Sequence, residues 1–97
     1  MKMNNEQINE TSYYRLPCGR FLEDFIWWKK LNFAEGSALK YQFRAGRKDG
    51  ESMDKEFLKR GHYIDYIADR ECRDFASVSV GIDLLMDEAM AWDGKEN

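Results

Sequence analysis

The sequence predicts a compact all-α bundle of three to four helices with a flexible N-terminal arm. Apolar residues recur mainly three or four positions apart, strand-like alternation is scarce, and the chain contains a single proline, Pro17. Its 97 residues, 43% hydrophobic and 34% charged, have the length and composition of one globular domain. We therefore expect residues 1–12 to form the arm and residues 13–97 to form one helical domain.

The first expected helix covers about residues 20–31. Phe25 and Trp28 lie on its apolar face. Trp27 is adjacent to Trp28 and therefore points roughly 100° away from it. We expect one of these two indoles to be buried and the other to lie at an edge or an interface.

The second expected helix has the clearest start signal in the chain. Asn32 precedes Glu35 by three residues, which is the spacing of a capping box. The helix should run through Ala45. Residues 36–38 are Gly-Ser-Ala, and we expect these small side chains to let another helix approach closely or to make room for a ligand.

The third expected helix starts at Ser52, a fair N-cap, and continues to about residue 74. Its expected buried stripe consists of Phe57, Gly61, Ile64, Ala68, Cys72 and Phe75. A last helix is expected over about residues 79–92, with an extended conformation as the alternative for residues 78–80. Its expected buried residues are Ile82, Leu85, Ala89 and Trp92.

The charge distribution limits the classes of partner. Residues 1–50 hold nine Lys/Arg and six Asp/Glu, a balance of +3, whereas residues 51–97 hold six and twelve, a balance of −6. A nucleic-acid binder is therefore disfavoured, while a local anion site and an acidic protein-binding surface remain open. No apolar run reaches the roughly 20 residues of a membrane span, and no secretory core precedes the domain, so we expect a cytoplasmic protein without a membrane partner.

The strongest candidate site is a basic stripe on the second expected helix. Its cations follow the spacing i, i+4, i+7 and i+8, which places them on one face. They are Lys40, Arg44, Arg47 and Lys48, with Gly46 inside the run. Guanidinium and ammonium groups at this spacing suit phosphate oxygens. The alternative is a solvated basic face paired with Glu35, Asp49 or Glu51.

A second polar line follows the third expected helix. It comprises Lys55, Lys59, His62 and Tyr66, flanked by Tyr63. If the two helices pack antiparallel, the lines border one cleft that offers cations for phosphates and rings for a base or sugar. His62 and Glu23 are the candidates for catalytic work, although each also reads as an ordinary surface residue. The chain contains no P-loop, nucleophile elbow, zinc pattern or HExxH motif, and we expect no metal site.

Residues 36–48 (GSALKYQFRAGRK) resemble the G-x-x-x-K-Y-x-x-R-A-G-x-K signature of a small phage family, domain of unknown function 3310. The resemblance implies a phage-encoded protein in the bacterial cytoplasm. It also implies kinase-like activity on deoxynucleoside monophosphates without a P-loop, with Mg²⁺ supplied with ATP. The positions matching the signature are Lys40, Tyr41, Arg44, Gly46 and Lys48, and Tyr63 matches a tyrosine further along.

Two functions from different classes follow. The leading expectation is a small nucleotide- or phosphate-binding protein, kinase-like if catalytic. The alternative is a non-enzymatic phage protein that binds and inhibits a host defence or replication protein, which the acidic C-terminal half favours. A homodimer is a further expectation, because Trp27, Met86 and Met90 are hard to bury in so small a bundle. The sequence leaves the substrate, the host target and the oligomeric state open.

Overall fold

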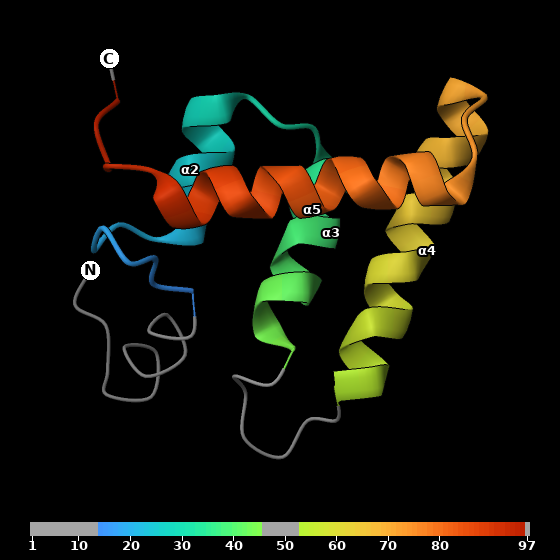
Figure 1. The fold of residues 1–97 in the computed structure, drawn as a ribbon, viewed down its shortest axis with the longest axis horizontal. Coiled ribbons are helices and arrows are strands. Elements are labelled where there is room, and N and C mark those ends of the chain that lie inside the picture. Colours follow the sequence, from blue (N-terminus) through green and yellow to red (C-terminus); the bar gives the residue numbers. More distant parts are fainter. Residues whose placement is uncertain (1–13, 46–52, 97) are drawn as a thin grey trace, which may run out of the picture.

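A computed structural model of the chain describes residues 14–45 and 53–96, and in these ranges the structure is all-α, as expected (Figure 1). The helices are α2 (Leu22–Lys29), α3 (Phe33–Arg44), α4 (Met53–Glu71) and α5 (Phe75–Ala91). The described residues form no strand; Arg15 and Phe21 make an isolated antiparallel bridge. The expected arm, residues 1–12, lies outside the described residues. Within them, no helix has the length and apolar character needed to cross a membrane.

The helices α3 and α4 pack side by side, and α5 lies across both of them (Figure 1). The far end of α5 reaches α2, where Trp92 stacks on Trp28 with 5.2 Å between ring centroids. All four helices contribute to a single core. Its members within these helices are Leu22, Phe25, Ala34, Ala38, Leu39, Phe43, Ile64, Ile67, Val78, Ile82 and Ala89. The expected burial of Ile82, Ala89 and Trp92 is confirmed, and Leu85 is partly buried.

The start of α3 is the one the sequence predicts. The backbone N–H of Glu35 donates to Asn32 Oδ1 (2.8 Å), and the N–H of Asn32 donates to the Glu35 carboxylate (3.1 Å). Gly36 allows a close approach, and the neighbour is α2: a Cβ on Gly36 would lie 3.1 Å from Ile26 Cγ2. The glycine is therefore explained by packing between α2 and α3.

The boundary between α4 and α5 differs from the predicted one. The helix α4 ends at Glu71, three residues early, because Cys72 adopts a left-handed conformation (φ 53°) and Arg73 N–H donates to the carbonyl of Ala68 (2.9 Å). The helix α5 then begins at Phe75, because Asp74 caps it by accepting a bond from Ser77 N–H (2.7 Å). Residues 78–80 are therefore helical, and the extended alternative is wrong.

The tryptophan expectation is confirmed for the exposed indole, and the other indole is partly buried. Trp27 is 81% exposed, whereas Trp28 packs against the core. The helix around them is shorter than expected because Lys30 takes a left-handed conformation (φ 61°) and ends α2.

The predicted buried stripe of α4 is confirmed at Ile64, only partly at Gly61 and Ala68, and wrong at its other three positions. Phe57 is 44% exposed, Phe75 is 43% exposed, and Cys72 is exposed as well. The buried residues are Glu56, Arg60, Ile64 and Ile67. Half of this stripe is charged, so a search for apolar periodicity could not find it.

Arg60 is buried because two neighbouring helices supply it with acceptors. Its Nε donates to Gln42 Oε1 on α3 (2.6 Å), and its Nη2 donates to Asp83 Oδ1 on α5 (3.1 Å). The same Nη2 reaches the carbonyl of Ser79 (3.2 Å), and the Gln42 amide donates to Asp83 (3.0 Å). The charge is thereby matched to polar partners and not left alone in the core.

We expect Arg60→Met to destabilise the domain by roughly 1.5–3 kcal/mol, the value of hydrogen bonds to a charged group. Urea unfolding followed by tryptophan fluorescence measures this loss. Lys29→Met is the matched control, because it removes an exposed pair with Glu88 (3.2 Å) that should contribute under about 1 kcal/mol. Equal losses in the two variants would contradict the bridging role of Arg60.

Candidate functional site

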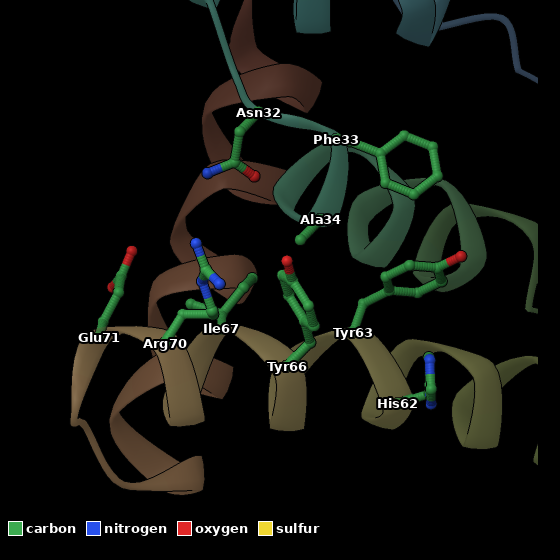
Figure 2. A pocket seen from close by; sticks show the side chains of 9 residues that line it. All are labelled: Asn32, Phe33, Ala34, His62, Tyr63, Tyr66, Ile67, Arg70 and Glu71. Carbon is green, nitrogen blue, oxygen red and sulfur yellow. The ribbon is translucent and has the colours of Figure 1, made fainter.

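A pocket of about 580 Å³ lies between the start of α3 and the second half of α4 (Figure 2). The residues that line it are Asn32, Phe33, Ala34, His62, Tyr63, Tyr66, Ile67, Arg70 and Glu71. Ala34 and Ile67 are buried, and the surrounding side chains are polar or aromatic. The pocket is therefore open to solvent over an apolar floor, as small-molecule sites commonly are.

Three aromatic rings form its walls. Phe33 projects from α3 and is 79% exposed, and its ring meets Tyr63 of α4 edge-on, with 5.8 Å between centroids. Tyr66 stands one turn further along α4 and is 53% exposed (Figure 2). Exposed rings at this spacing offer faces on which a flat aromatic ligand can stack.

One cation lies inside the same pocket. The guanidinium of Arg70 sits over the Tyr66 ring, 5.9 Å from its centroid. Glu71, one of the two acids adjacent to Arg70 in the chain, accepts a hydrogen bond from Arg73 (2.8 Å). His62 is exposed, meets Tyr63 edge-on at 5.2 Å, and lies at the opposite end of the pocket from Glu71 (Figure 2).

The two polar lines expected from the sequence meet at Tyr41. Its ring stacks on Tyr63 (5.9 Å, 14° between planes), and Lys40 Nζ and Lys59 Nζ lie 5.8 Å and 5.4 Å from its centroid. A row of rings, Phe33–Tyr63–Tyr41, thus connects the pocket to two lysines from different helices. This convergence follows from the side-by-side packing of α3 and α4.

Arg44 departs from the expected solvent-facing stripe. Its side chain is only 12% exposed, and its Nη2 lies 3.6 Å from Oε1 of Glu56, whose side chain is 1% exposed. It also hydrogen-bonds Tyr14. The charge of Arg44 is therefore matched inside the protein by an acid that the sequence interpretation did not consider. Gly46, Arg47 and Lys48 lie outside the described residues.

The remaining candidates lie apart from the pocket. Lys55 is exposed near the start of α4. Glu23 and Lys40 line a second cavity of about 330 Å³, which shares Asn32 and Phe33 with the first. Asp24, next to Glu23, caps the start of α2: its carboxylate accepts a hydrogen bond from the backbone N–H of Phe21 (2.9 Å). Among residues 14–45 and 53–96, no three His, Cys, Asp or Glu side chains gather as metal ligands would.

Sequence interpretation missed Phe33 and Arg70. The signal for Arg70 was present, because Lys59, Tyr63, Tyr66 and Arg70 follow the spacing i, i+4, i+7 and i+11 of one helix flank. Phe33 gave no comparable signal, since an aromatic residue just after an N-cap is usually assigned to the core.

Burial raises the pKa of Tyr14 above its ordinary value of 10.0, and Arg44 partly opposes the rise. The unfolded chain therefore loses this proton first, so the stability contributed by neutral Tyr14 is complete below about pH 10 and is lost as the pH rises through the folded-state pKa. We expect Tyr14→Phe to reduce the fall in the free energy of unfolding as the pH rises from about 8 to about 11. Urea unfolding at each pH measures this, and the exposed Tyr66→Phe is the control. An equal effect of both variants would contradict the assignment.

The chain was compared with protein-family models, with curated proteins and with solved structures. No family model, curated protein or solved structure matches it.

Proposed function

We propose that this chain binds a nucleotide, with the base in the pocket between α3 and α4. The observation that carries the proposal is the combination of three aromatic walls with the Arg70 guanidinium in one open pocket of about 580 Å³. A nucleotide joins a flat aromatic ring to an anionic group. The pocket offers a partner for each part.

The rings of Phe33, Tyr63 and Tyr66 would hold the base. Phe33 and Tyr66 are substantially exposed, so the folded chain leaves aromatic surface in water that a stacked base would cover. Base-to-aromatic stacking contributes about 1–3 kcal/mol per base and tolerates any base. Asn32, at the rim, adds an amide that can donate or accept a hydrogen bond.

The phosphate would meet Arg70. A guanidinium presents parallel N–H groups that match two phosphate oxygens. Lys40 and Lys59, beyond the Tyr63–Tyr41 stack, add positive charge on the same side of the α3–α4 pair.

Calorimetry with deoxynucleosides and their monophosphates tests each half of the site. We expect Tyr66→Ala to weaken the binding of both ligands by about 1–3 kcal/mol, because it removes a stacking face. Arg70→Ala should weaken the binding of the monophosphate by about 1.5–3 kcal/mol and leave the binding of the nucleoside nearly unchanged, because only the monophosphate contacts the guanidinium.

Two variants serve as matched controls. Leu58→Ala removes an exposed apolar side chain from the same helix, and Arg15→Ala removes an exposed guanidinium elsewhere. Both should bind like the parent protein. Wild-type protein that binds no nucleoside monophosphate, or an Arg70→Ala loss equal for nucleoside and monophosphate, would sink the proposal.

The resemblance to the phage family supplies a finer proposal, in which the bound monophosphate accepts a phosphoryl group from ATP. That version expects Mg²⁺-dependent formation of a deoxynucleoside diphosphate, measured by anion-exchange chromatography, with positioning and charge stabilisation as the catalytic means. His62→Asn tests whether the imidazole at the end of the pocket takes part. Binding without any diphosphate product would leave a nucleotide-binding protein and remove the kinase.

A further inference from the structure

The outward side of α5 is apolar at its centre and acidic beside it. Val80 and Leu84 are 57% and 60% exposed, one turn apart on the same face. Asp83 and Asp87 flank them, and residues 75–91 contain no Lys or Arg at all. This face therefore carries negative charge next to apolar surface, and of its two aspartates Asp83 is paired with Arg60 of α4.

A methionine-lined groove adjoins this face. Its volume is about 240 Å³, and it lies between the C-terminal end of α3, the start of α4 and the second half of α5. Met53 and Phe57 contribute from α4, and Met86 and Met90 from α5. Met53, Phe57 and Met90 are 54%, 44% and 38% exposed. Methionine side chains are flexible and polarisable, and they adapt well to an incoming apolar group.

The acids border the groove because of their helix spacing. Asp83 precedes Met86 by three residues and Asp87 precedes Met90 by three, so each carboxylate stands within one turn of a groove methionine. Asp83 already accepts from Arg60, but its side chain remains 57% exposed. Asp87 is exposed between the groove and Leu84.

We propose that this surface docks an amphipathic helix of a partner protein, whose apolar anchors enter the methionine groove and whose Lys or Arg side chains pair with Asp87 and Asp83. Helix-in-groove recognition uses this arrangement of anchors and flanking charge. Charge complementarity selects the occupant: two α5 faces in contact would bring Asp87 of each copy together, and residues 75–91 offer no Lys or Arg to pair with it, so a second copy of this chain is disfavoured.

The surface is independent of the proposed nucleotide pocket. The groove is built from the end of α3, the start of α4 and α5, whereas the pocket is built from the start of α3 and the rest of α4. They share no lining residue. Loss of one function therefore leaves the other measurable.

The test uses fluorescence anisotropy with the full chain and an array of labelled helical peptides. Each peptide carries Leu or Met at i, i+4 and i+7 and Lys or Arg at the flanking positions, and is paired with a copy in which Glu replaces every basic residue. We expect the basic peptides alone to bind, with an affinity that falls as salt rises.

Three variants give the decisive comparison. Met90→Glu and Asp87→Lys should each lower affinity for the basic peptides by roughly tenfold or more, as expected for a hot-spot side chain. Asp87→Lys should also gain affinity for the matched Glu peptide. Leu58→Glu alters an apolar residue that is 76% exposed elsewhere on α4 and should change nothing.

Circular dichroism and nucleotide binding of Met90→Glu confirm that the fold and the other site persist. Equal binding of basic and acidic peptides, or basic peptides that bind all three variants alike, would overturn the proposal. A dimer in light scattering that Leu84→Asp dissolves would overturn it as well, because it would assign the face to a second copy. Absence of binding across the whole array has the same consequence.

Discussion

The arrangement of this domain depends on the buried guanidinium of Arg60. It joins Gln42 on α3 to Ser79 and Asp83 on α5, so one side chain of α4 is bonded to both neighbouring helices. Removing a charge from water is costly unless its hydrogen-bonding groups find partners. The acceptors on α3 and α5 occupy fixed positions, so the guanidinium can satisfy them in only one orientation of α4. It therefore specifies the rotation of α4 about its axis more strictly than apolar contacts do. Leu, Ile and Phe side chains tolerate several rotations at similar cost.

The rotation of α4 determines what its two flanks present. With Glu56, Arg60, Ile64 and Ile67 facing inward, one flank carries Lys59, Tyr63, Tyr66 and Arg70 toward the aromatic pocket. The other flank carries Met53 and Phe57 toward the methionine groove. A helix turned by one residue, roughly 100°, would bury the tyrosines or the phenylalanine and remove one of the surfaces. The same internal bond thus places both candidate sites.

Arg44 and Glu56 form a second internal pair with a different character. The separation of 3.6 Å is long, and Arg44 Nε and both oxygens of Glu56 have no hydrogen-bond partner within the described residues. A pair of this kind contributes little net stability, but removal of one partner leaves the other charge buried without a counter-charge. The pairing also reduces the positive charge that the protein presents to a ligand at this surface. Arg44 lies 5.8 Å from the Tyr41 ring, as Lys40 does, but its charge is paired with Glu56 and its side chain is only 12% exposed.

The all-α class, the capping box of α3 and the contrast between an exposed and a partly buried indole could be predicted from the sequence, because they depend on residues within a turn or two of each other. The sequence also placed Tyr63, Tyr66 and His62 among the candidates, and all three line the pocket. The inward stripe of α4, the internal pairing of Arg44 and the contribution of Phe33 to the pocket became visible once the helices were packed together. Those outcomes rest on partners such as Asp83 and Glu56 that lie on other helices. Whether a charged side chain is buried depends on an acceptor across an interface, and no local spacing encodes that.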